Sequence, residues 1–266
     1  MNKKSSILIV TVWMTLILTL MSVSLYHLIF SPLKVISAAR RSMQGYYAAC
    51  GIVEKIRCEL QARNYSLYSL NDLPFCEETE PGMSISAFVA DESSKLNINK
   101  ADIQDIQVIS AISQEDLDEI QQERGHQPYA SMLQLPELNE SKNLFTVFGD
   151  GSVNINTAPQ QVLFAVGVDE VLAGDIIQIR KGQDMIWGTA DDVIFGSLND
   201  LAMKMGAYDL WQERYRGQIE RLISLKRLDF KTGPWIADVT VLFENTSEIH
   251  YHIVIDKNGV LDWQEW

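Results

Sequence analysis

The stretch "ILIVTVWMTLILTLMSVSLYHLIF", residues 7–30, has no Asp, Glu, Lys or Arg in 24 positions. A helix of about 20 such residues crosses the roughly 30 Å hydrocarbon core of a membrane. Lys3 and Lys4 precede it, and basic residues favour the cytoplasmic side. In a Gram-negative cell, this predicts a single-pass inner-membrane protein. Residues 1–30 would form the leader and transmembrane helix, with a cytoplasmic N-terminus and a periplasmic remainder.

A cleaved secretory signal is the alternative to this anchor. The small residues of "ISAAR", residues 36–40, offer a site for a signal peptidase. The apolar run is, however, about twice as long as the usual apolar region of a signal peptide. We therefore favour an anchor that stays attached to the chain.

The apolar run continues into a segment with a different pattern. Residues 33–63 carry apolar side chains at three- and four-residue intervals, which is typical of one face of an amphipathic helix. Pro32 lies between the two segments and can kink or interrupt one long helix. On this stem, Ile36, Met43 and Tyr46 are candidate contacts for partner subunits, or they pack on the chain's own sheet. The stem helix and a first strand are assigned to residues 31–96.

Four segments predict strands of an antiparallel sheet. β-Forming residues alternate in the first half of residues 83–98, and longer runs cover residues 218–230, 235–244 and 249–256. The turn-forming stretches "KTGP" and "NTSE" separate the last three runs, which assigns C-terminal strands to residues 214–266. Because strands flank a helical middle on both sides, the predicted fold is α+β. Residues 97–213 would be an α-helical domain inserted into one unit made of the stem helix and the sheet.

The inserted segment contains a repeat, because "NINKA" at 97–101 returns as "NINTA" at 154–158. Each copy is followed by a helical stretch, a turn and a second helical stretch. This order indicates a duplicated helix-hairpin-helix unit. We expect Asn99 or Asn156 to act as a helix N-cap, with Pro159 near the first turn of the helix in the second copy.

Helix-hairpin-helix units often bind DNA, through Gly-rich hairpins whose N–H groups approach a phosphate. The two hairpins here read "AISQED" and "AVGVDE", and they contain four acids and one glycine. Residues 97–213 carry 6 Lys and Arg against 19 Asp and Glu, a net charge of −13. Because such a surface repels nucleic acid, we expect no nucleic-acid partner. A membrane-anchored DNA receptor of the competence type is kept as the alternative function.

The loop "GQDMIWGTADDVIF", residues 182–195, is the best candidate for a metal site. Asp184, Thr189, Asp191 and Asp192 lie within nine residues of one another and supply hard oxygen ligands, the kind that Ca²⁺ prefers. The spacing is not that of an EF-hand, and no Glu closes the loop. The alternative is a solvated acidic loop in which Asp191 or Asp192 caps a helix.

The sequence gives little support for catalysis, since it has no nucleophile elbow, phosphate-binding loop or zinc-spaced Cys pair. His250 and His252 lie on one face of a predicted strand and can bind a metal. No third ligand lies within readable reach in the sequence, so surface histidines are the simpler interpretation. We therefore expect no enzyme activity.

The three cysteines leave the redox state open. Cys50 and Cys58 would be about 12 Å apart on one helix, too far for a disulfide. Either one reaches Cys76 if the following loop folds back, and an oxidising periplasm permits that bond. Reduced thiols on the apolar face of the stem are the alternative.

Taken in order along the chain, several motifs resemble the minor pseudopilin K family of type II secretion systems, also called general secretion pathway protein K. They are the anchor with Trp13, the stem helix, "VADESSKLNINKAD", "FGDGSVNINTAPQQVL", the acidic loop and the terminal "GVLDWQEW". The resemblance implies a pilin-like fold with a large inserted α domain. It also implies a tip cap of the periplasmic pseudopilus that assembles with I- and J-type minor pseudopilins and binds Ca²⁺ at the acidic loop.

The same resemblance places a prepilin peptidase cleavage site between Ser5 and Ser6, which makes this peptidase a second implied partner. Ser5 stands where the family has glycine, so the chain departs from the pattern at the cut itself. The fifth residue after the cut is Val10 and not the glutamate of most pilins, as suits the K member. A tip subunit lacks the neighbour whose amine would pair with that acid, and an unpaired charge in a membrane is costly.

Overall fold

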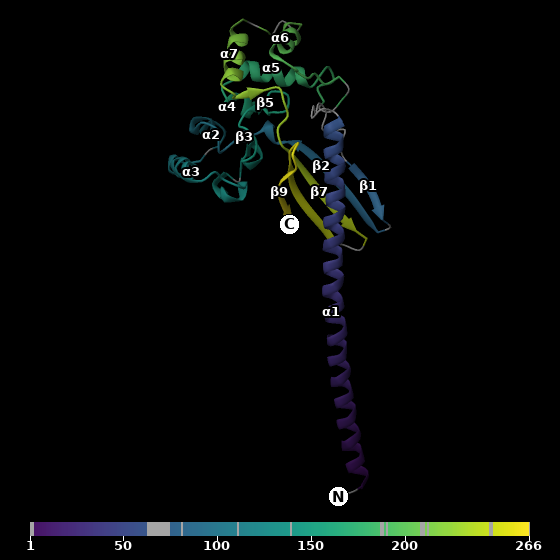
Figure 1. Ribbon diagram of the computed structural model, residues 1–266. Coiled ribbons are helices and arrows are strands. Elements are labelled where there is room, and N and C mark those ends of the chain that lie inside the picture. Colours follow the sequence, from purple (N-terminus) through teal and green to yellow (C-terminus); the bar gives the residue numbers. More distant parts are fainter. Residues whose placement is uncertain are drawn as a thin grey trace. The chain divides into compact units, whose positions relative to one another are not determined.

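The computed structural model divides the chain into two units, residues 1–50 and residues 51–266. It describes residues 3–62, 75–80, 82–110, 112–138, 140–186, 189, 191–207, 211, 213–244 and 247–265. The first unit is part of one long helix. The second contains the end of that helix, a five-stranded sheet and an α-helical domain (Figure 1).

Helix α1 covers Lys3–Ala62, a length of 60 residues, and it continues through Pro32. The proline therefore does not interrupt the helix. The residues Val10–Gln61 form a helix that is long and apolar enough to cross a membrane. Within its apolar part, the hydroxyl of Thr19 donates to the carbonyl oxygen of Thr15 at 2.9 Å, so this polar group is satisfied within the helix itself.

The sheet is antiparallel, with the strand order β1-β2-β7-β8-β9. The strands are β1 Phe75–Glu80, β2 Met83–Asp91, β7 Trp235–Phe243, β8 Ser247–Ile255 and β9 Val260–Glu265. The predicted strands over residues 83–98, 235–244 and 249–256 are confirmed as β2, β7 and β8. Strands β1 and β9 extend the sheet at its two edges beyond the predicted set.

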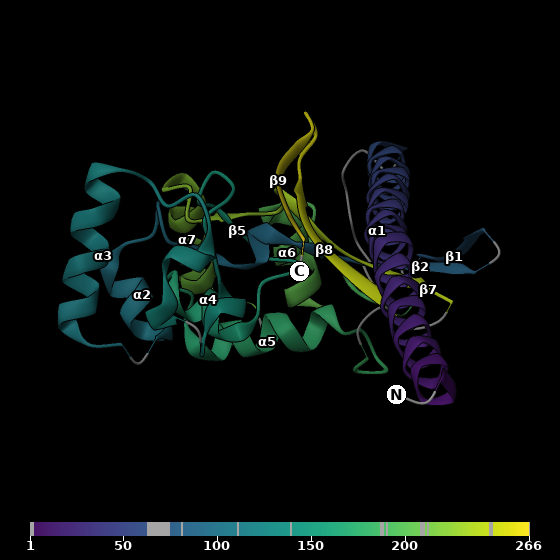
Figure 2. The ribbon, with the colours of Figure 1, turned by 90° about the horizontal axis from the view of Figure 1, so that it is seen from below.

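One face of the sheet is buried because apolar residues alternate along its strands. In β2, the residues Ile85, Ala87 and Val89 are buried, while the intervening Ser86 and Phe88 are exposed. Residues 51–62 of α1 lie beside the sheet in both views (Figures 1 and 2). This part of the helix contributes four buried side chains, namely Ile52, Val53, Ile56 and Leu60. In residues 51–62, the stem therefore buries one apolar face, as its pattern indicates for this part.

The prediction of a strand over residues 218–230 is wrong. Residues Glu213–Ser224 form helix α7, and only Leu228–Asp229 are extended, as β6. Tyr215, Ile219 and Leu222 are the buried residues of α7, and their spacing of four and three residues is that of one helix face. Burial of this face on the α domain decides the structure over the β-forming residues between them.

The α domain is inserted between β2 and β7, two strands that are neighbours in the sheet. Its helices are α2 Ile103–Ile109, α3 Gln114–His126, α4 Gln160–Ala165, α5 Glu170–Arg180, α6 Leu198–Gly206 and α7. The predicted helices of both copies are thus present. Two short parallel pairs join them, β3 Leu96–Asn97 with β4 Phe145–Thr146, and β5 Val153–Asn154 with β6. A single apolar cluster fills the domain, from Leu96 to Leu228 along the chain.

Candidate functional site

The second asparagine of each repeat joins distant backbone segments. Asn99 accepts from the N–H of Tyr129 at 2.8 Å and donates to the carbonyl oxygen of Tyr129 at 2.9 Å. Asn156 makes the same pair of bonds with Phe195, also at 2.8 and 2.9 Å. A side-chain amide has both an acceptor oxygen and donor N–H groups. It can therefore bond to the N–H and the carbonyl oxygen of one backbone residue, as a residue of a neighbouring strand does. The repeat is therefore present in the contacts as well as in the sequence.

The expectation that these asparagines cap helices is wrong. The N-cap of α2 is Asp102, and the N-cap of α4 is Pro159. The first asparagine of each motif begins a tight turn instead, because Asn97 accepts from the N–H of Asn99 at 2.9 Å and Asn154 accepts from the N–H of Asn156 at 3.0 Å. An amide two residues ahead is the usual partner of an Asn side chain in such a turn.

In each copy, an arginine also bonds to the backbone of the same turn, and Arg180 is buried while Arg124 is half-buried. Arg124 donates to the carbonyl oxygens of Ile98 and Ala101 at 2.8 and 2.6 Å. Arg180 donates to those of Ile155 and Ala158 at 3.2 and 2.7 Å. Burial lowers the pKa of Arg180 to about 9, while the Asp192 carboxylate raises it. Both arginines therefore hold the backbone of the turn in place.

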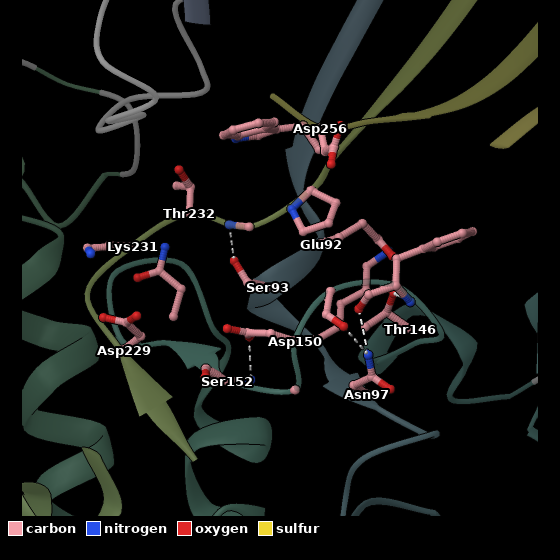
Figure 3. A pocket seen from close by; sticks show the side chains of 18 of the residues that line it. Glu92, Ser93, Asn97, Thr146, Asp150, Ser152, Asp229, Lys231, Thr232 and Asp256 are labelled. Carbon is pink, nitrogen blue, oxygen red and sulfur yellow. Dashed lines mark hydrogen bonds and ion pairs between the residues drawn. The ribbon is translucent and has the colours of Figure 1, made fainter. Parts of the chain in front are cut away.

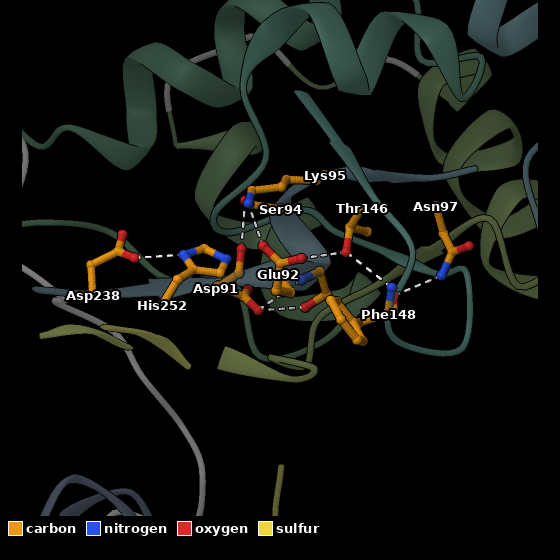
Figure 4. Close-up of polar contacts among 10 residues, drawn as sticks. Asp91, Glu92, Ser94, Lys95, Asn97, Thr146, Phe148, Asp238 and His252 are labelled. Atoms are coloured by element: carbon orange, nitrogen blue, oxygen red, sulfur yellow. Dashed lines mark hydrogen bonds and ion pairs between the residues drawn. The ribbon is translucent and has the colours of Figure 1, made fainter. Parts of the chain in front are cut away.

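The α domain is joined to the sheet by a buried carboxylate, that of Asp91 at the end of β2 (Figure 4). Its Oδ1 accepts from the N–H and hydroxyl of Ser93 at 3.0 and 2.6 Å and from the N–H of Gly233 at 3.2 Å. Its Oδ2 accepts from Asn154 at 2.9 Å and from Thr157 at 2.6 Å. Five donors thus bring together the sheet, the second repeat and the segment that leads into β7.

The next residue, Glu92, adds a second link at the same place. Its buried carboxylate accepts from Lys95 and from the hydroxyl of Thr146 (Figure 4), and its N–H donates to the carbonyl oxygen of Pro234 at 2.8 Å. We refer to Asp91 and Glu92 with these partners as the junction.

Beside the junction lies a cavity of about 590 Å³ (Figure 3). Its walls come from residues within four segments, 92–97, 146–156, 229–235 and 256–257, and from Gly196. The charged residues of the wall are four acids, Glu92, Asp150, Asp229 and Asp256, and three lysines, Lys95, Lys231 and Lys257. The mixed charge gives the cavity no clear preference for an anion or a cation.

The acidic loop is organised around Asp191. Its carboxylate accepts from the hydroxyl of Thr189 at 2.6 Å and from the N–H groups of Gln183 and Asp184 at 2.6 and 3.1 Å. The bonds from Thr189 first, then from Asp184 and Gln183, lower the pKa of Asp191 to about 2. Gly182 has a φ of +65°, and a Cβ there would lie 2.5 Å from the carbonyl oxygen of Asp191, so the loop requires glycine at this position.

Of the four predicted calcium ligands, Thr189 and Asp191 contact each other through their side chains, while Asp184 reaches Asp191 through its backbone N–H. The carboxylate of Asp184 accepts instead from the N–H of Ile186 at 2.8 Å, and that of Asp192 raises the pKa of the buried Arg180. In the part of the chain that the structure describes, no group of three or more His, Cys, Asp or Glu side chains is already gathered for a metal.

The three stem positions predicted to meet partners are exposed. Ile36 is 61% exposed, Met43 59% and Tyr46 45%. Cys50 and Cys58 are free, with Cys58 exposed. The predicted bond to Cys76 and the cleavage site at Ser5 and Ser6 involve side chains outside the described part.

The fold is that of an α+β protein in which a long N-terminal helix leads to an antiparallel sheet, the arrangement of pilin-like proteins. One solved structure that is similar is a chain of the GspK-GspI-GspJ complex from the enterotoxigenic Escherichia coli Type 2 Secretion System. The TM-score is 0.59 at 13% identity, and the match covers 87% of this chain and 99% of that chain. No family model matches the sequence, and no curated protein sequence matches it either. At this identity the likeness establishes the fold.

Proposed function

We propose that the chain is a minor pseudopilin of a type II protein secretion system and that it assembles with other minor pseudopilins. The insertion of an α domain between neighbouring strands β2 and β7, in a chain that begins with a membrane-length helix, is the observation that carries the proposal. The likeness over 99% of a chain from a complex with GspI and GspJ supports it. The partners would then be I- and J-type subunits.

Assembly would use the exposed side of the stem. Ile36, Met43 and Tyr46 are large, exposed and apolar or aromatic, and such residues pack well between helices in the manner of ridges and grooves. Because they follow the apolar run along α1 and precede its buried end, they would lie just outside the membrane in this proposal. We therefore assign them to contacts with partner stems.

Affinity purification of tagged full-length protein from detergent-solubilised membranes, followed by mass spectrometry, tests this assignment. The wild type should recover small pilin-like subunits, and Met43→Glu should recover fewer. Ser42→Glu is the matched control. Ser42 is exposed, and this substitution introduces the same charge about 100° away around the helix. Equal recovery with both variants would refute the stem contact. Recovery of DNA at low salt, with no pilin-like subunit, would favour the DNA receptor instead.

We further propose that the subunit caps the tip of the pseudopilus. The α domain lies at the end of the sheet toward which residues 51–62 of α1 run (Figure 1). In a stack of pilin-like subunits, a domain at that end would occupy the space of the next subunit outward. Removal of the leader between Ser5 and Ser6 by prepilin peptidase is part of this proposal, and mass spectrometry of the mature N-terminus tests it.

Calcium at the acidic loop is the last part of the proposal. Asp184, Thr189 and Asp191 would hold the ion together with loop carbonyl groups, and the ion would stabilise the loop. The low pKa of Asp191 supports this, since the carboxylate is charged at any ordinary pH. We expect the melting temperature to be higher in millimolar Ca²⁺ than in chelator. The increase should be smaller in Asp191→Asn. Identical melting in both conditions would exclude the site.

A further inference from the structure

The face of the sheet opposite Ile85, Ala87 and Val89 carries two histidines with acidic neighbours. His250 and His252 alternate along β8 with buried residues, and Glu248 precedes them on the same face. The sequence of this face is therefore Glu-x-His-x-His. Asp238 on β7 is the residue paired with His252 across the two strands.

Each histidine lies beside a carboxylate on this face. His252 Nδ1 lies 2.6 Å from Asp238 Oδ1 (Figure 4). His250 Nε2 lies 3.4 Å from Glu248 Oε1, and its Nδ1 lies 3.1 Å from the hydroxyl of Thr240. All four side chains are partly open to solvent, with exposed fractions between 25% and 50%.

We propose that this face binds a divalent transition metal such as Zn²⁺, with His250, His252 and Asp238 as ligands. Two imidazoles and a carboxylate are a known donor set for zinc, and they leave a fourth position for water or for a side chain of another molecule. Alternate residues of a strand are about 6.6 Å apart along the chain, so two imidazoles on one face can reach a common ion. The third ligand, which the sequence did not reveal, comes from the neighbouring strand.

The side chains must turn to close around the ion. None of the described residues already form a group of three such ligands around one point, because each imidazole faces its own carboxylate. Rotation of exposed side chains about χ1 and χ2 is inexpensive compared with moving backbone, and the strand pairing already fixes the backbone positions. Glu248, which already lies beside the imidazole of His250, would orient that ring, as carboxylates do around zinc sites.

Such an ion would clamp β7 to β8 on the face opposite the buried Ile85, Ala87 and Val89. This inference does not depend on the proposed function. It also concerns a site on the sheet that is separate from the acidic loop, where hard oxygen ligands favour Ca²⁺ over Zn²⁺.

Isothermal titration of the full-length protein in detergent micelles with Zn²⁺ tests the proposal. We expect one ion per chain and a loss of affinity of about tenfold or more in His252→Ala and in His250→Ala. His126→Ala removes an exposed histidine on α3 and should leave binding unchanged, as should Asp191→Asn in the acidic loop. Circular dichroism of each variant separates a lost ligand from a lost fold. Absence of zinc binding, or binding that survives in the folded His250→Ala and His252→Ala variants, would overturn it.

Discussion

Replacement of Asp91 by alanine should uncouple the α domain from the sheet. Asp91 is buried and accepts five hydrogen bonds from Ser93, Gly233, Asn154 and Thr157. A hydrogen bond to a charged group contributes about 1.5–3 kcal/mol, and a buried donor left without an acceptor costs about 1–3 kcal/mol. Because all five bonds share one carboxylate, their losses are not additive. We expect Asp91→Ala to lower the free energy of unfolding by about 3–5 kcal/mol.

Denaturant unfolding of the full-length protein in micelles, followed by tryptophan fluorescence, measures this loss, since the buried Trp235 pairs with Asp91 across β2 and β7. Asp150→Ala is the matched control. Asp150 is exposed, lines the same cavity and accepts one bond, from the N–H of Ser152 at 3.0 Å. Its replacement should cost about 0.5 kcal/mol or less. Equal stability of the two variants would show that the junction does not hold the α domain to the sheet.

Further substitutions test the repeat and the acidic loop. Asn156→Ala removes both bonds to Phe195 and should lower the free energy of unfolding by about 2–4 kcal/mol. Asn99→Ala should also destabilise the protein. Unchanged urea midpoints in these variants would contradict the role of the asparagines. Gly182→Ala should destabilise the protein by about 1–3 kcal/mol, because Gly182 has a positive φ and Asp191 lies close to it. Gly217 in α7 has open space around it, so Gly217→Ala should stabilise the protein by about 0.5–1 kcal/mol. Folding lowers the pKa of Asp191 from 3.8 to about 2. The ionised carboxylate therefore contributes its full stabilisation above the unfolded pKa of 3.8, and this contribution is lost as the pH falls through the folded pKa of about 2. In calcium-free buffer, the difference in melting temperature between wild type and Asp191→Asn should therefore shrink between those two pH values, and a constant difference would contradict the assignment.

The features that sequence predicts here are those set by local pattern. The apolar run, the alternation along β2, β7 and β8 and the paired helices of each repeat all depend on residues a few positions apart. Helix α7 was missed because its β-forming residues suggested a strand, whereas burial of Tyr215 and Ile219 on the α domain selected a helix. Packing between elements decides such cases, and a single sequence does not contain it.

The polar contacts were missed for a related reason, which is their separation along the chain. Asn99 bonds to a residue 30 positions away and Asn156 to one 39 positions away, so an N-cap was the nearest local interpretation. Asp91 joins partners up to 142 positions away. One signal was available, because the alternation of Ile85, Ala87 and Val89 places the next odd position, Asp91, on the buried face. An acid at that position requires donors from elsewhere in the chain.

The junction also has a consequence for the proposed function. The α domain leaves the sheet at Asp91 and returns at Trp235, and these two residues face each other in neighbouring strands. Two adjacent connections alone would allow the domain to turn as on a hinge, so its orientation depends on the bonds of Asp91 and Glu92 to both sides. If the α domain caps a filament, that orientation decides whether it meets its partners. Conservative changes at the junction that keep the protein folded should therefore reduce assembly with other pseudopilins, although no junction residue lies on the exposed stem.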